Sequence, residues 1–298
     1  DISLMYSPDF ISIYSSENAG VNGIYTTDGL LQLSVDNKSF MKFNLDGIAN
    51  KDICNLDLYD VDVNLGKLCT YVNIDDFMSI YNGDLTGEVI VTGKIFDPDF
   101  TGSALITSGE VVMPWLTPQK LKVADMNFVF NHNEIEMQDT LLTIKSGEKV
   151  NIRFTFYMNK WELENIEGTV KNYNKELFPV KMPLNVASLT GNVYVDLKVY
   201  MDAEHVEVSG DCFGENVKLN SSLAEISALS QDSDEELQSL PIYADLNIQL
   251  GTHASVNFDP ILRCVFVPNT SINCKIDTDS ELYQLDGSLL LKSGDVSY

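Results

Sequence analysis

Basic residues are scarce in this chain of 298 residues. Lysine and arginine together number 19, against 44 aspartates and glutamates, which gives a formal net charge of −25. Binding to duplex nucleic acid needs a basic face that displaces counterions, so nucleic acid is not expected as a partner. Adsorption to anionic lipid head groups is disfavoured by the same sign of charge. An acidic excess of this kind is typical of a surface that keeps a protein soluble.

Long apolar runs and a targeting segment are also missing. No run of about 18 apolar residues occurs, so no segment is expected to cross a membrane as a helix. The first residues lack the basic region and apolar stretch of a signal peptide. The chain begins at Asp1 rather than methionine and stops at Tyr298, directly after a strand-like run. We therefore expect an excised part of a longer protein, long enough to bury a substantial core.

Catalytic and metal-binding motifs are absent from the sequence. The three histidines, His132, His205 and His253, stand far apart and form no H-E-x-x-H pair. No nucleophile elbow and no phosphate-cradling glycine loop occurs. The acidic stretches at residues 232–236 and 277–281 resemble calcium loops, but they lack the glycine and the final glutamate of an EF-hand. The sequence therefore predicts no enzyme, no catalytic residues, no cofactor and no metal.

The five cysteines show no C-x-x-C spacing, so the sequence has no motif typical of zinc binding or of thioredoxin-like redox chemistry. Cys264 and Cys274 lie in strand-like runs and could pair if their strands are adjacent. An odd total leaves at least one cysteine without an internal partner. We favour the interpretation that the cysteines are small buried hydrophobic residues.

Strict alternation of apolar and polar residues is the dominant pattern that is present. In residues 151–159 the even positions are Ile, Phe, Phe and Met, and the odd ones are polar or tyrosine. Residues 191–200 and 244–250 alternate in the same way. Successive side chains of a strand point to opposite faces, so these strands have one apolar and one polar face. Weaker alternation marks further strands at residues 30–35, 40–45, 85–95, 124–130, 134–142, 206–213 and 255–267. The chain is predicted to be all-β.

Two segments depart from strand spacing. Residues 220–239 begin with one or two turns of helical spacing and continue as an acidic stretch, which predicts a helical and acidic loop. Residues 73–81 place Ile74, Phe77, Met78 and Tyr81 at helical spacing. We expect the apolar side of that helix to face the core.

One strand phrase returns near the end of the chain. Residues 100–111 read FTGSALITSGEV and residues 285–296 read LDGSLLLKSGDV, with six of twelve positions identical. Self-similar strands with no helices between them indicate a stacked or spooled sheet.

These repeated phrases, in this order, resemble the C-terminal region of the TamB family of translocation and assembly module subunits. That family belongs to the AsmA-like and bridge-like lipid-transfer proteins. The resembling motifs are residues 83–102 leading into residues 108–114, and residues 285–287 leading into residues 293–298. The resemblance covers residues 80–298, and residues 1–79 share only the general strand pattern.

The resemblance implies a β-taco, which is a long antiparallel sheet curled into a U with an apolar interior. One elongated segment over residues 1–298 is then expected. The implied setting is the bacterial periplasm, in a protein anchored in the inner membrane by a part outside this chain. The implied function is to move phospholipid to the outer membrane. The implied partners are phospholipid acyl chains and an outer-membrane β-barrel partner of the TamA or BamA type.

Strands that are apolar on one face suit such a groove physically. Burying each CH₂ of an acyl chain contributes about 0.8 kcal/mol, while the head group stays in water and needs no specific pocket. The candidate groove-lining residues are Val89, Val91, Ile106, Phe128, Phe130, Phe154, Phe156, Val193, Val195, Leu197, Val199, Leu246, Ile248, Leu289 and Leu291. The alternative for these residues is a closed sandwich or barrel core in which they pack against each other. With the resemblance, we expect the open groove.

Two other functions stay open. An assembly chaperone would pair an open edge strand with a strand of an outer-membrane β-barrel protein. A surface β-solenoid with a sealed core would take up neither lipid nor a barrel strand. An enzyme would need a cluster of carboxylates on one face, whereas the acids here are scattered.

Overall fold

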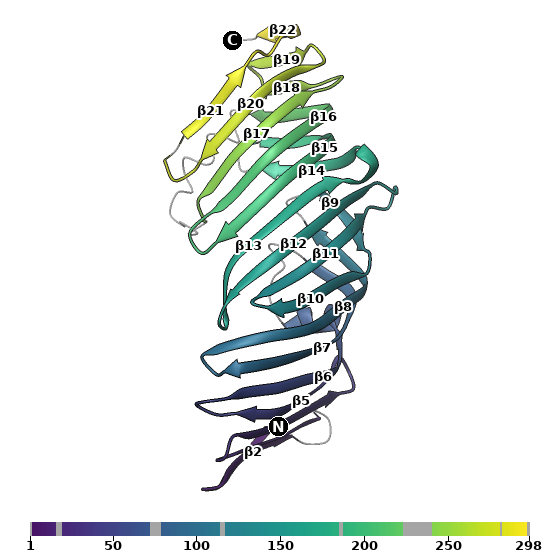
Figure 1. Cartoon of the computed structure of the whole chain (residues 1–298). Coiled ribbons are helices and arrows are strands. Elements are labelled where there is room, and N and C mark those ends of the chain that lie inside the picture. Colours follow the sequence, from purple (N-terminus) through teal and green to yellow (C-terminus); the bar gives the residue numbers. More distant parts are fainter. Residues whose placement is uncertain are drawn as a thin grey trace. The chain divides into compact units, whose positions relative to one another are not determined.

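The computed structural model describes residues 2–15, 20–71, 79–113, 117–184, 187–222, 240–280 and 282–296. Over these ranges the chain is all-β, as predicted, with one long mixed sheet of 22 strands and a few short helical turns (Figure 1). No helix in the described ranges is long and apolar enough to cross a membrane. The chain divides into two compact units. Unit 1 is Asp1–Val111, Lys122–Thr140 and Arg153–Asn165, and unit 2 is Val112–Leu121, Leu141–Ile152 and Ile166–Tyr298.

Unit 1 begins as an antiparallel meander in which each strand pairs with the next. Its strands are β1 (Ile2–Tyr6), β2 (Phe10–Ser15), β3 (Val21–Thr26), β4 (Leu30–Asn37), β5 (Met41–Ala49), β6 (Cys54–Asn64) and β7 (Ser79–Lys94). Next come β8 (Asp97–Met113), β9 (Thr117–Val123), β10 (Met126–His132) and β11 (Glu134–Thr143). Strand β10 pairs with both β8 and β11 in antiparallel fashion. Five strands contribute residues to both units: β8, β9, β11, β12 (Lys149–Asn159) and β13 (Glu162–Asn172).

Unit 2 continues with two long strands and with shorter strands around them. They are β14 (Phe178–Leu184), β15 (Ala187–Asp202), β16 (Val206–Ser222), β17 (Ile242–Leu250), β18 (Ser255–Asp259), β19 (Leu262–Phe266), β20 (Thr270–Asp277), β21 (Leu282–Gly287) and β22 (Leu291–Val296). The first part of β16 pairs with β17 and its last part pairs with β18, both in parallel. Beyond β16 the sheet therefore continues as two tiers, β17–β20–β21 and β18–β19–β22.

These parallel pairs correct the prediction of a purely antiparallel sheet. A parallel pair needs a long connection that returns the chain to the same end of the sheet. Nineteen residues separate Ser222 from Ile242, which is enough for such a return. The predicted single strand at residues 255–267 is two strands, β18 and β19, joined by a tight turn.

A one-residue bulge bends β16 while keeping its apolar side chains on one face. Residues 215–218 of β16 lie opposite residues 190–192 of β15, where the register shifts, and Asn216 has a φ of 54°. Before the bulge the even positions Val208 and Cys212 carry the apolar side chains, and after it the odd positions Val217 and Leu219 do. A bulge reverses the parity of a strand, so all four side chains stay on the same face.

The bend continues across the neighbouring strands of unit 2. Backbone hydrogen bonds join the short connections that follow β17, β19 and β21 to one another and to the bulge of β16. The nitrogens of Asn216 and Asn269 donate to the oxygens of Thr252 and Leu250, at 2.8 and 2.7 Å. Strands β21 and β22 accordingly run in different directions in Figure 1.

The apolar face lies on the inside of this bend. A Cβ on Gly214 would collide with the side chain of Val217, three residues further along the same strand. The bulge puts both positions on one face, where neighbours on a straight strand lie about 7 Å apart. The new Cβ would lie only 3.8 Å from the Cβ of Val217, so the strand folds toward this face. A Cβ on Gly191 would lie 2.9 Å from the Cα of Val217, so glycine leaves the space that the valine fills.

The described helical turns are short. They are α1 (Leu65–Leu68), η1 (Cys69–Tyr71) and η2 (Tyr173–Lys175). Asn64 caps α1 by accepting a hydrogen bond from the Lys67 nitrogen at 3.0 Å. Most of the two predicted helical segments, residues 72–78 and 223–239, lies outside the described residues.

Candidate binding face

Apolar side chains form continuous rows across four strands of unit 2. Directly paired residues of a sheet point to the same face, so the strand register identifies the members of each row. The first row is Val195, Cys212, Ile248 and Ile272, and the second is Leu197, Gly210, Leu246 and Cys274. A third consists of Val199, Val208, Ala244 and Ile276. We call these three rows the apolar face of unit 2.

The side chains of this face are half-buried. Each of its twelve residues keeps part of its surface accessible, and none is fully buried. In contrast, Phe178 and Val180 on the neighbouring strand β14 are only 2% and 7% exposed. The predicted residues Val193, Val195, Leu197, Val199, Leu246 and Ile248 all lie on this side of the sheet, as their register shows.

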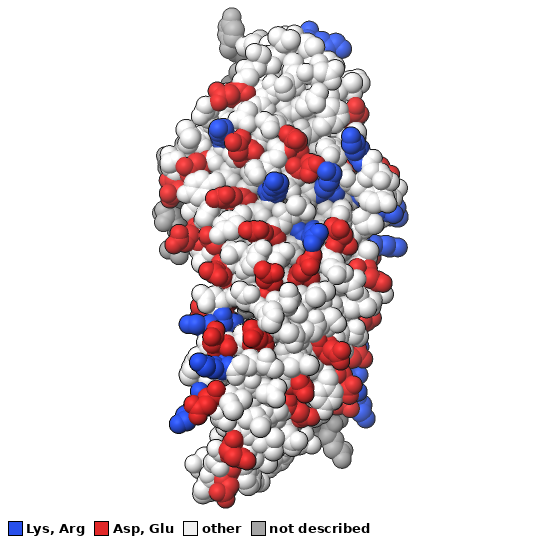
Figure 2. All heavy atoms as spheres, in the orientation of Figure 1, with Lys and Arg blue, Asp and Glu red and all other residues white. Residues whose placement is uncertain are grey.

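The opposite face of the same strands is polar and hydrogen-bonded. The Asn247 amide donates to Asp211 at 3.2 Å, and the Asn273 amide donates to Asp245 at 2.7 Å. Lys275 pairs with the same aspartate at 3.6 Å. Acidic side chains are scattered over the molecule with fewer basic ones among them, as the view in Figure 2 shows. The two faces therefore differ sharply in polarity, as the alternation predicts.

Two thiols belong to the apolar face. Burial raises the pKa of Cys212 to about 11, with smaller contributions from Asp211 and Cys274. Burial also raises the pKa of Cys274. Such thiols are protonated at neutral pH and therefore pack as small hydrophobic groups. All five cysteines are free, and Cys264 lies on β19, which pairs with β18 and β22 and not with the strand of Cys274.

Unit 1 has a longer apolar row. It runs through Leu4, Ile13, Gly23, Leu33, Leu45, Leu58 and Val89, one residue from each of the strands β1 to β7. Part of this side is closed by a core cluster of Cys54, Leu56 and Val91, against which Val89 and Phe100 pack. The predicted groove residue Val91 is accordingly only 8% exposed.

The other predicted residues fall into three sets. Ile106, Phe128 and Phe130 share one face of the β8–β10 pair and are half-buried. Phe154 and Phe156 are half-buried on β12. Leu289 lies in the connection between β21 and β22, and Leu291 begins β22; both are exposed.

Sequence reasoning missed several members of the rows. Leu33, Leu45 and Leu58 extend the row of unit 1, and Ile272 and Cys274 extend those of unit 2. The alternation at residues 30–35 and 40–45 marked the first two as strand residues. Only the register shows that they continue a row several strands away.

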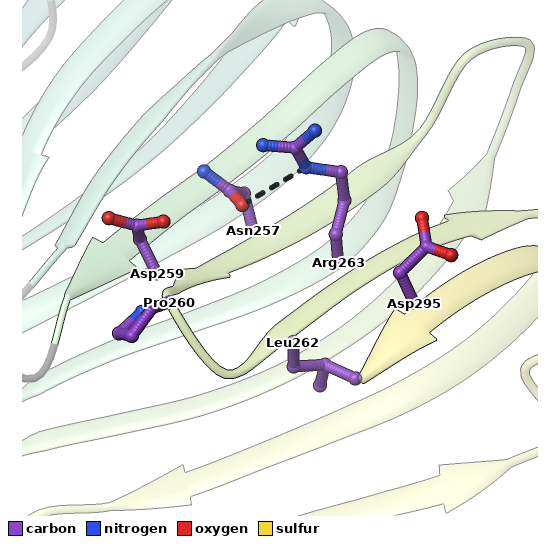
Figure 3. Close-up of a pocket in the computed structure, with 6 residues that line it drawn as sticks. All are labelled: Asn257, Asp259, Pro260, Leu262, Arg263 and Asp295. Atoms are coloured by element: carbon purple, nitrogen blue, oxygen red, sulfur yellow. Dashed lines mark hydrogen bonds between the residues drawn. The ribbon is translucent and has the colours of Figure 1, made fainter. Parts of the chain in front are cut away.

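Two surface depressions of the described residues are small and contain polar groups. One, of about 210 Å³, is lined by Asn257, Asp259, Pro260, Leu262, Arg263 and Asp295, with Arg263 Nε 3.4 Å from the Asn257 oxygen (Figure 3). The other, of about 320 Å³, includes Asp57, Tyr59 and Glu88. In the described ranges no three His, Cys, Asp or Glu residues are grouped to hold a metal ion. The apolar face is therefore the strongest candidate site.

The chain matches no family model, no curated protein and no solved structure. Its candidate function therefore depends on the geometry above and on the repeated motifs of the sequence.

Proposed function

We propose that this chain carries phospholipid by holding acyl chains against the apolar face of unit 2. The observation that carries the proposal is the set of uninterrupted apolar rows with half-buried side chains. No charged residue interrupts these rows. A single layer of sheet that leaves such side chains partly accessible offers surface that an apolar ligand can cover.

The dimensions and energetics fit an acyl chain. Four neighbouring strands span about 14 Å at the usual strand spacing. Each CH₂ removed from water contributes about 0.8 kcal/mol, so an acyl chain of ordinary length gains on the order of 10 kcal/mol before its ordering is counted. The contact is non-directional, so no polar pocket is needed. The setting in the bacterial periplasm and transport toward the outer membrane follow from the resemblance to the TamB family, and they are part of the proposal.

Native mass spectrometry with lipid extraction tests the proposal. Phospholipid should accompany the purified chain and should be lost in the variant Ile248→Asp, which places a charge in the middle of the first row. The matched control is Gln249→Asp, the next residue of β17, which points to the polar face. Lipid retained by Ile248→Asp, or lost equally in both variants, would contradict the proposal. A lipid-free chain would favour the sealed solenoid.

A second candidate function has its own observation. Within the described residues, β21 pairs only with β20, and its Tyr283 and Leu285 are 69% and 65% exposed. A free edge of this kind can accept a strand of another protein, as an assembly chaperone for β-barrel proteins would require. Cysteine crosslinks from position 285 to a β-barrel protein, with no lipid on the apolar face, would favour this function.

A further inference from the structure

The hairpin turns of unit 1 fall on two sides, and one side holds the β1–β2, β3–β4, β5–β6, β7–β8, β10–β11 and β12–β13 turns. In an antiparallel meander alternate turns lie at the same side of the sheet, which places the first four together. The β10–β11 turn lies beside them, because His132 at the end of β10 pairs with Phe100 near the start of β8. The β12–β13 turn joins them, because the Trp161 indole nitrogen donates to the Ile95 oxygen in the β7–β8 turn at 2.6 Å. The β5–β6, β7–β8 and β12–β13 turns lie on the left of unit 1 in Figure 1.

This side, which we call the rim, carries large apolar side chains in solvent. Its exposed apolar residues are Leu30, Ile48, Ile53, Phe96, Trp161 and Leu163. Phe96 is 74% exposed, although it occupies a turn where a polar residue would be expected. At the opposite side the β4–β5 turn is polar at residues 38–39, and on the rim the β1–β2 and β10–β11 turns are polar as well, so the apolar groups are concentrated in the other turns of the rim.

Local contacts hold two of the apolar groups of the rim, Trp161 and Ile53, in place. Trp161 packs edge-on against Phe100 with ring centroids 5.4 Å apart, and its N–H is already bonded to the Ile95 oxygen. In the β5–β6 turn, Asn50 Oδ1 accepts hydrogen bonds from the Asp52 and Ile53 nitrogens, both at 3.0 Å. Transfer of these tips into an apolar medium therefore costs little ordering entropy and leaves no indole N–H unsatisfied.

Charge is locally balanced at three of the tips. Lys51 and Asp52 accompany the first, Lys94 and Asp97 the second, and Lys160 and Glu162 the third, each beside an exposed apolar residue. The chain as a whole carries −25, so these three tips lack the acidic excess of the chain as a whole.

We propose that this rim docks on the surface of a zwitterionic lipid bilayer, with Phe96, Trp161 and Ile53 entering the interface. A line of tips, three of which carry large exposed apolar groups, fits a laterally continuous surface better than a single pocket in a protein. Aromatic side chains favour the membrane–water interface, and lysine stems extend along it with the ammonium in water. The inference goes beyond the proposed function, because it concerns an intact bilayer and residues outside the apolar face of unit 2.

Flotation with phosphatidylcholine vesicles tests this inference. The wild-type chain should float with the vesicles, and Phe96→Asp together with Ile53→Asp should lower the bound fraction at least tenfold. Both residues are exposed, so these substitutions should leave the fold intact, which circular dichroism checks. Tyr283→Asp, an equally exposed aromatic residue of unit 2, is the matched control and should float normally. A wild-type chain that stays with the unbound fraction, or a double variant that still floats, overturns the inference.

Tryptophan fluorescence supplies a second measurement. In a Trp115→Phe background, which leaves Trp161 as the one tryptophan of the sequence, brominated phosphatidylcholine should quench the emission of the vesicle-bound chain, and the further change Trp161→Phe should remove that emission while flotation persists. Emission that is not quenched in the vesicle-bound Trp115→Phe variant would place a different surface against the bilayer and would also overturn the inference. The variant Ile248→Asp should lose extracted phospholipid but keep flotation, and the rim variant should show the reverse. Failure of one proposal is therefore distinguishable from failure of the other.

Discussion

Deleting Asn216 tests whether the bulge in β16 is what keeps the apolar side chains on one face. Without the extra residue, either Val217 and Leu219 turn to the polar face and Lys218 turns inward, or the pairing with β15 shifts. Fully burying a valine or leucine contributes about 1.5–3 kcal/mol, and these two are half-buried, so their loss is worth about 2–3 kcal/mol. The hydrogen bond from the Asn216 nitrogen to the Thr252 oxygen adds about 1 kcal/mol.

The deletion should therefore lower the free energy of unfolding by about 3–4 kcal/mol, a large part of the stability of an ordinary domain. Urea unfolding followed by far-UV circular dichroism measures this change. The matched control is Asn216→Gly, which keeps the bulge and suits the φ of 54°. It should stay within about 1 kcal/mol of the wild type. A deletion that costs no more than this control would refute the reasoning.

Three further predictions concern single side chains. The hydrogen bond to Glu207 raises the pKa of His205 above its ordinary 6.5. The protonated His205 therefore contributes its full stabilisation below pH 6.5, and this contribution is lost as the pH rises through the pKa of His205 in the folded state. Urea unfolding at a series of pH values should show this loss of stability in the wild type and not in His205→Gln. Trp161→Phe removes the hydrogen bond to Ile95 and should cost about 1 kcal/mol in urea unfolding; no change would show that this bond does not stabilise unit 1. Gly214→Ala should lower the free energy of unfolding by about 1–3 kcal/mol in the same assay, because the new methyl group would collide with the side chain of Val217 at the bend of β16. An unchanged free energy of unfolding would mean that the bend opens without cost.

Comparison of sequence and structure shows where local pattern is sufficient. The alternation in residues 191–200 and 244–250 predicted both the strands and the polarity of their two faces, because side-chain direction in a strand depends only on position. The same reasoning treated residues 255–267 as one strand, although Pro260 follows a turn signal at Asp259. The bulge at Asn216 left no clear signal, since an insertion of one residue changes parity without changing composition.

The sequence did not predict which strands pair with each other in the sheet. Residues Cys212 and Ile272 are sixty positions apart and belong to one row because β17 lies between their strands. The parallel pairing of β16 with two successive strands depends on where the long connection returns, which no local pattern encodes.

The sequence by itself determined that this chain is all-β, strongly acidic and amphipathic strand by strand, because these properties depend on composition and on a period of two residues. The tertiary structure decided which apolar residues form continuous rows, where unit 2 bends and which hairpin tips share one rim. Those features arise from register, bulges and hydrogen bonds between distant strands, and these depend on how the whole chain pairs rather than on any one segment.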